Sequence, residues 1–242
     1  GGVQTTLKSR PFLYLCAATF LVFNGFILIA AFQSYVVIYY IFGGNEALGA
    51  EFVFYAGAAG AIAGFGIVLL SAWLGTQIGK RRALMVCIVV SVVGYLMKWF
   101  AYDPANPWLV LLPAPFMAFG FASLFTLVPA MVADVVDLDE LNTHERREGT
   151  YGSIYWWIVK LGLAGALAAG GVLLNVTGFD VELGGAQTER TLFLLRVFDV
   201  AIPALTSAVA IWAIWRYPIT EARALAIRKE LEARRGPVGL AE

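Results

Sequence analysis

Charged and metal-binding side chains are scarce in this chain of 242 residues. Charged residues make up 14% of the sequence, against about 25% in an ordinary soluble domain. The 17 basic and 17 acidic side chains cancel, so there is no basic excess of the kind that binds nucleic acid. The single histidine, His144, lies in a charged segment. This excludes a histidine-based catalytic or metal site within the apolar parts of the chain.

Cysteine and an N-terminal targeting pattern are also missing or nearly so. Cys16 and Cys87 both fall inside apolar runs, where we expect them to pack as small hydrophobic side chains and to form neither a disulfide nor a metal site. The chain begins Gly-Gly-Val without an initiator methionine, and the apolar run after Lys8 and Arg10 is far too long for a signal peptide. We therefore expect a fragment, or a domain of a longer polypeptide.

Long apolar runs dominate what is present, with 60% hydrophobic residues and a mean hydropathy of +0.76. A membrane-spanning helix needs about 20 apolar residues. Six runs are long enough: 12–42, 51–73, 83–102, 108–133, 150–176 and 191–217. The sequence thus predicts an all-α membrane protein, with a six-helix transmembrane bundle over residues 1–217. Residues 218–242 form a charged tail, whose helical part we expect to be solvated or to lie on the membrane surface.

The basic residues between the runs predict the orientation of the bundle. One side carries only Arg190. The other side carries thirteen basic residues: Lys8, Arg10, Lys80, Arg81, Arg82, Arg146, Arg147, Arg216, Arg223, Arg228, Lys229, Arg234 and Arg235. Because cytoplasmic loops collect lysine and arginine, residues 74–82, 134–149 and 218–242 are predicted to be cytoplasmic. Both ends of the chain then lie on the cytoplasmic side of a plasma membrane, such as a bacterial inner membrane.

Lys160 is the most informative single residue. It lies about eleven residues into an apolar helix, which at 1.5 Å per residue puts it roughly 16 Å deep in a hydrocarbon layer about 30 Å thick. A lysine at that depth costs about 2.5–3.5 kcal/mol. We therefore expect Lys160 to face a water-filled cavity or a bound polar or anionic group, with an ion pair inside the bundle as the alternative. Trp156 shares its helix face, with Tyr155 adjacent, and an indole ring suits a sugar's C–H surface.

Two charged segments resemble a known group of transporters. Residues 75–82, Gly-Thr-Gln-Ile-Gly-Lys-Arg-Arg, look like the basic loop of the major facilitator superfamily. Residues 133–140, followed by Arg146-Arg147-Glu148-Gly149 and by a lysine fourteen residues after Arg146, resemble the glycoside–pentoside–hexuronide cation symporters, the group of melibiose permease. The resemblance covers essentially the whole chain. It implies helices seven to twelve of a twelve-helix transporter, built as two inverted three-helix repeats.

The resemblance also implies a function and a partner. It implies a secondary transporter that moves a sugar or glycoside with Na⁺ or H⁺ by alternating access, with the substrate bound between two six-helix halves. The cation site of such symporters lies mainly in the N-terminal half, which would be the partner of this chain in the lipid bilayer. No cofactor other than the coupling cation is expected. Lys160 takes the position of the cavity-facing lysine, and Phe125 that of a tryptophan found in some sugar transporters.

Several other polar residues are candidates for substrate contact or gating. Asn24 and Gln33 have cavity-compatible depths, or bond across helices. Asp134 and Asp137 need cationic partners at the cytoplasmic end of their helix, where negative charge opposes the helix dipole. The candidate partners are Arg146, Arg147, Arg81, Lys80 and Arg82. We expect these groups to form ion pairs that break and re-form during gating, with a static solvated loop as the alternative.

The remaining intramembrane charges have simpler expectations. Arg196 and Asp199 are three residues apart and are expected to pair on one helix face, while Lys98 is expected to snorkel outward. Small residues recur at four-residue spacing in two spans, and such rows allow close helix contact. The contact lies either within this half or at the seam between halves. The two rows are Ala56, Gly60, Gly64 and Gly162, Ala166, Gly170.

Three other functions stay open from the sequence. The first is transport of an anionic or lipid-like solute on the same fold, because a lysine suits a carboxylate or phosphate as well as a hydroxyl. The second is a membrane scaffold or receptor without transport. The third is an intramembrane enzyme such as a protease. The sequence has neither an intramembrane histidine nor a paired catalytic aspartate motif, so we expect no enzyme.

Overall fold

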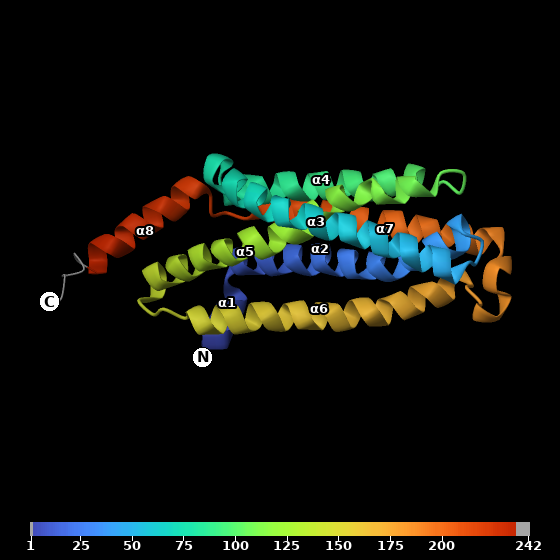
Figure 1. The fold of residues 1–242 in the computed structure, drawn as a ribbon. Coiled ribbons are helices and arrows are strands. Elements are labelled where there is room, and N and C mark those ends of the chain that lie inside the picture. Colours follow the sequence, from blue (N-terminus) through green and yellow to red (C-terminus); the bar gives the residue numbers. More distant parts are fainter. Residues whose placement is uncertain (1, 236–242) are drawn as a thin grey trace.

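The computed structural model describes residues 2–235 and is built from helices (Figure 1). The long helices are α2 (Arg10–Tyr35), α3 (Glu46–Ile78), α4 (Lys80–Ala101), α5 (Pro113–Thr143), α6 (Glu148–Thr177) and α7 (Glu189–Arg216). The short ones are α1 (Gly2–Lys8), the π-helical η1 (Val36–Ile41), the 3₁₀ helices η2 (Pro107–Leu111) and η3 (Val181–Ala186), and α8 (Glu221–Arg235). Six helical segments are long and apolar enough to cross a membrane, which confirms the six predicted spans and the all-α class.

The six spans run alternately in opposite directions (Figure 1). One end of the bundle holds α1, the α3–α4 turn, the α5–α6 connection and α8, and the other end holds the remaining three connections. α2 packs against α6 and α7, while α4 packs against α5 and α7. The thirteen basic residues predicted to be cytoplasmic therefore belong to segments that gather at one end of the bundle.

Short-range chemistry sets several helix ends. Asn45 caps α3 because its side chain accepts a hydrogen bond of 3.2 Å from the Leu48 N–H. Thr188 caps α7 in the same way, accepting from the Thr191 N–H at 3.2 Å. Gly79 joins α3 to α4 in a single residue with φ of +86°, a backbone conformation that glycine adopts without a steric penalty.

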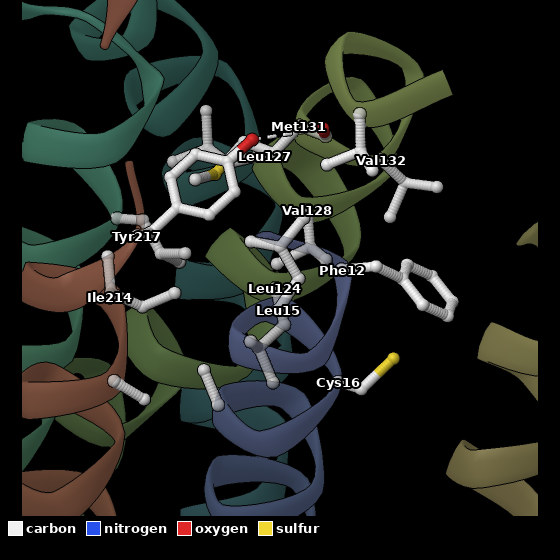
Figure 2. Close-up of a cluster of buried hydrophobic side chains, with 14 of the residues drawn as sticks. Phe12, Leu15, Cys16, Leu124, Leu127, Val128, Met131, Val132, Ile214 and Tyr217 are labelled. Carbon is white, nitrogen blue, oxygen red and sulfur yellow. Dashed lines mark hydrogen bonds between the residues drawn. The ribbon is translucent and has the colours of Figure 1, made fainter. Parts of the chain in front are cut away.

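The largest buried cluster joins α2, α5 and α7 near the end of the bundle that carries α8 (Figure 2). Leu15 of α2, Leu124 of α5 and Ile214 of α7 all belong to this cluster and are fully buried. Tyr217, just after α7, donates a hydrogen bond of 3.3 Å to the Met131 carbonyl. Burial raises the pKa of Tyr217, so its hydroxyl keeps its proton and remains a donor.

The fourth predicted span ends too early, at residue 133, because the segment after it is largely helical and not a loop. α5 continues to Thr143 and ends at His144, whose φ of 61° is left-handed, so the connection to α6 is only a few residues long. The acidic turns stay helical because cations neutralise their side chains, and because Leu141 packs against Ile227 and Leu231 of α8. Asp134 and Asp137 are therefore not at the last turn of the helix.

Two predictions about intramembrane charges are also wrong. Lys98 does not snorkel: it is 2% exposed, and its Nζ lies 2.6 Å from Oδ2 of Asp199. The Tyr102 hydroxyl donates to the same carboxylate oxygen. Asp199 does not pair with Arg196, because α4 brings Lys98 directly across the α4–α7 interface. The Arg196 guanidinium instead lies 4.3 and 4.4 Å from two ring centroids, those of Tyr40 and Trp99.

Candidate functional site

Lys160 lies on an exposed face of α6, one helical turn beyond Trp156. Trp156 is itself 48% exposed. Among residues 2–235, no carboxylate lies within ion-pair distance of Lys160. The described bundle therefore offers this lysine no counter-charge, and its ammonium group remains available to a ligand.

A row of neighbouring aromatic rings leads from Trp156 into the bundle. The Trp156 ring stacks on Phe125 of α5, with centroids 6.2 Å apart and planes inclined by 24°. Phe125 touches Phe121 at 5.0 Å, and Phe121 stacks on Phe26 of α2 at 4.5 Å. The rings join α6, α5 and α2 into one continuous aromatic surface, with Lys160 one turn from its end.

An open groove of about 670 Å³ begins at the inner end of this aromatic row, between α2, α3 and α5. Phe26, Phe121 and Phe125 line one part of it, and Gln33 contributes one of its few polar groups. The opposite wall is made by the small residues of α3. Gly57 and Gly64 line the groove, and a Cβ atom on either would meet nothing within 4 Å. All three residues of the α3 row line the groove, with free space beside Gly64 and with Ala114 3.6 Å from a Cβ atom on Gly60.

The corresponding row on α6 is closed by α2. A Cβ atom on Gly162 would lie 2.5 Å from Nδ2 of Asn24, and one on Gly170 would lie 3.5 Å from Leu28. This row therefore serves helix packing inside the chain. The two rows have different roles, although their spacing in the sequence is the same.

Two predicted contact residues lie in the α2–α6 interface. Asn24 donates from Nδ2 to the Phe20 carbonyl at 2.6 Å, and its Oδ1 is buried without a hydrogen-bond partner in the described part of the chain. Tyr155 is only 4% exposed, with its hydroxyl 3.5 Å from that of Thr19. The structure therefore does not bring Tyr155 onto the exposed face with Trp156 and Lys160, but uses it to hold α6 against α2.

The acidic end of α5 carries a network of ion pairs. Asp134, 3% exposed, lies 2.8 Å from Lys80 of α4 and 2.8 Å from Arg228 of α8. Arg146 bridges Asp137 at 3.2 Å and Glu140 at 3.0 Å. These contacts fasten α4 and α8 to α5, and they hold the short α5–α6 connection in place.

Two further arginines differ from expectation. Arg147 pairs with Asp139, 3.0 Å away, and not with Asp134 or Asp137. Arg81 has no carboxylate partner among residues 2–235; it donates from Nε to the Ile214 carbonyl at 3.2 Å, and also to the carbonyl of the next residue. A cation at the last carbonyls of a helix is favourable because it satisfies them and complements the helix dipole. Arg81 therefore caps α7.

Sequence reasoning missed the role of Arg228 in this network. The residue lies in a charged stretch that reads equally well as a solvated helix. The signal available was the apolar spacing of Ile227 and Leu231, which places one apolar stripe on an otherwise charged helix. That stripe packs on Leu141, and the packing brings Arg228 to Asp134.

These features define a class of protein: a multi-pass integral membrane protein with one half of a major facilitator fold and an open groove on one face. Residues 1–221 match the family described as MFS/sugar transport protein, and the chain belongs to that family. Members of this family are transporters of small molecules across membranes.

Three relatives place the chain within the family. It is 30% identical over 180 residues to an uncharacterised symporter of Synechocystis sp., covering 72% of this chain and 33% of the relative. It is 24% identical to a glucuronide carrier protein homolog of Escherichia coli, covering 96% of this chain and 49% of the relative. It is 24% identical to an isoprimeverose transporter of Lactiplantibacillus pentosus, covering 63% and 31%. The chain thus spans about half the length of these relatives or less.

Proposed function

We propose that this chain is the C-terminal half of a secondary transporter that carries a sugar or glycoside together with Na⁺ or H⁺. The observation that carries the proposal is Lys160, an ammonium group without a carboxylate partner in the described chain, beside the stacked rings of Trp156 and Phe125. Aromatic faces pack against the C–H surface of a sugar, and an ammonium group donates to its hydroxyls. The isoprimeverose transporter supports a sugar substrate by its name.

A second six-helix half is the proposed partner of the open face. α3 and α6 are the least buried of the six spans, and the groove between α2, α3 and α5 lacks a wall on one side. An N-terminal half of the same transporter would cover it and enclose the substrate near the middle of the membrane. Rocking of the two halves would then give alternating access, and the coupling cation would bind mainly in the other half.

An anionic substrate is the second candidate, again because of Lys160. A carboxylate would compensate its charge at mid-membrane depth better than a hydroxyl does. The glucuronide carrier protein homolog supports this candidate by its name, since a glucuronide carries a carboxylate. The apolar lining of the groove also accommodates a lipid-like solute. Competition of a neutral glycoside and its uronic acid for uptake distinguishes the first two candidates.

The ion pairs at the end of α5 are proposed to act as gating contacts. Asp134 holds Lys80 and Arg228 at once, and Asp137 holds Arg146. Opening of the transporter at this end would separate some of these pairs, and closing would restore them. Arg147 stabilises the same region through Asp139, whereas Arg81 is a helix cap and is left out of the gating set.

The first prediction tests the proposed partner. Vesicles that contain residues 1–242 alone should show no uptake of a glycoside, because the groove has one open side. Expression together with the preceding six-helix half of the polypeptide should restore measurable uptake. The matched control is the same pair with Lys160→Gln. Uptake by residues 1–242 alone would mean that two copies form the pathway, and the half-transporter proposal would be wrong.

The second prediction tests the orientation. With Cys16 and Cys87 replaced, a cysteine at Glu145 should resist an impermeant maleimide in intact cells and react after permeabilisation. Glu145 has an exposed side chain in the α5–α6 connection, so access depends on the side of the membrane. The control is a cysteine at Glu182, in η3 at the opposite end, which should react in intact cells. Reaction of the Glu145 position from outside would reverse the proposed topology.

A further inference from the structure

A second cavity, of about 600 Å³, lies at the α8 end of the bundle, away from the substrate groove. It is formed where the α3–α4 turn meets the end of α7 and the start of α8. Its polar lining includes Arg81, Arg82 and Thr220, and its apolar lining includes Met85 and Trp215. None of these residues takes part in the proposed substrate site.

The cavity has an excess of positive charge. Arg82 is exposed and has no carboxylate within ion-pair distance in the described chain. Arg216 follows Trp215 of the lining and has its guanidinium over the rings of Trp212 and Trp215 at 5.5 and 5.7 Å. The one acid in the lining is Glu221, which already receives the Lys80 ammonium at 3.6 Å and the Lys80 backbone N–H at 3.5 Å.

The start of α4 adds to this potential. Gly79 precedes the helix and provides no side-chain cap. The Lys80 N–H is directed to Glu221, and the N–H groups of Arg81 and Arg82 keep the positive partial charge of a helix N-terminus. Arg82 belongs to this first turn. An anion in the cavity would therefore meet the Arg82 side chain and a favourable helix end together, while the Arg81 guanidinium caps α7.

The surface that continues from the cavity is apolar and exposed. On α4, Arg82 is followed at helical spacing by three exposed valines, which are 45%, 48% and 47% exposed: Val86, Val89 and Val93. On α7, Trp215 is preceded by Trp212, Val209 and Leu205, all more than half exposed. α4 and α7 pack against each other. A cationic cavity therefore stands at the head of two neighbouring apolar strips in a membrane-spanning bundle.

We propose that this cavity binds the phosphate of an anionic phospholipid, with the acyl chains lying along the exposed strips of α4 and α7. Arginine forks match phosphate oxygens in pairs, and tryptophan is favoured at the level of the lipid headgroups. Basic pockets between membrane helices bind anionic headgroups by the same physics. The apolar strips favour a lipid over free phosphate, because free phosphate has no apolar part that could pack on them.

Native mass spectrometry of the purified protein in detergent tests the proposal with three probes: phosphatidylglycerol, phosphatidylcholine and inorganic phosphate. Phosphatidylglycerol should bind more tightly than phosphatidylcholine, and Arg82→Gln should weaken its binding about fivefold, the effect of one basic residue at a lipid surface. Arg190→Gln, an exposed arginine at the opposite end, should leave binding unchanged. Arg216→Gln repeats the test through a second residue if Arg82→Gln does not fold.

Three outcomes would overturn the proposal. Equal binding of the two lipids would show that the headgroup charge is not recognised. Equal losses in Arg82→Gln and Arg190→Gln would show that any surface arginine attracts the lipid. Displacement of phosphatidylglycerol by inorganic phosphate at equal concentration would show that the cavity takes free phosphate.

Discussion

Lys98→Met is expected to lower the free energy of unfolding by about 3–5 kcal/mol, the cost of leaving a buried carboxylate without its partner. In the wild type, Lys98 and Asp199 lie 2.6 Å apart and are 2% and 1% exposed. Methionine fills a similar volume but leaves Asp199 with the Tyr102 hydroxyl as its one donor among residues 2–235. Denaturant titration in mixed micelles measures the change.

A double variant separates charge from packing. Lys98→Met combined with Asp199→Leu removes both charges and should recover most of the lost stability, because a buried ion pair is often replaced by apolar side chains at little cost. Lys8→Met is the matched control, since Lys8 is exposed on α1, and it should change little. If Lys98→Met unfolds at the wild-type denaturant concentration, the pair does not hold α4 to α7.

Lys160→Gln in the complete transporter is expected to reduce uptake at least about tenfold, the factor that roughly 1.4 kcal/mol of lost binding gives. Membrane abundance should stay near normal, because no described residue depends on Lys160 as an ion-pair partner. Lys160→Arg should also transport poorly, since a broad planar guanidinium does not reproduce a compact ammonium donor. Initial rates of solute uptake in vesicles, normalised to protein in the membrane, measure both effects.

The structure provides a control for this experiment. An alternative in which Lys160 only neutralises Asp199 conflicts with the geometry, because Asp199 is bound by Lys98. Trp157→Phe is a suitable comparison: Trp157 is 63% exposed on the same helix, and no stacking contact joins it to the aromatic row in the described residues. Solute uptake by the Trp157→Phe variant should stay near the wild-type rate. Normal uptake by Lys160→Gln would remove Lys160 from the substrate site.

The class, the six spans and the end of the bundle that gathers basic residues could all be predicted from the sequence. Each depends on local properties: the length of an apolar run, and lysine or arginine in a connection. The expectations for Lys98 and Arg196 failed because the sequence of one membrane helix does not determine which helix packs against it. Both helices were placed correctly, but only their packing shows that Lys98 reaches Asp199.

The candidate site divides in the same way. The four-residue spacing predicted that Lys160 and Trp156 share one face of their helix. The rotation of α6 against α2 decides that Tyr155 is buried, and the sequence holds no clear signal for that rotation. The groove and its aromatic row arise from three helices together, so no single segment could reveal them.

The bare backbone of α3 has a consequence for engineering selectivity. Where Gly57 and Gly64 face the groove, there is no side chain to rotate aside or to adapt its shape. The width of the groove at these points is set by main-chain atoms, which do not change rotamer. A methyl or isopropyl group added there would narrow the groove by a fixed amount. Alanine or valine at these two positions should therefore disfavour bulky solutes while the charge at Lys160 stays unchanged.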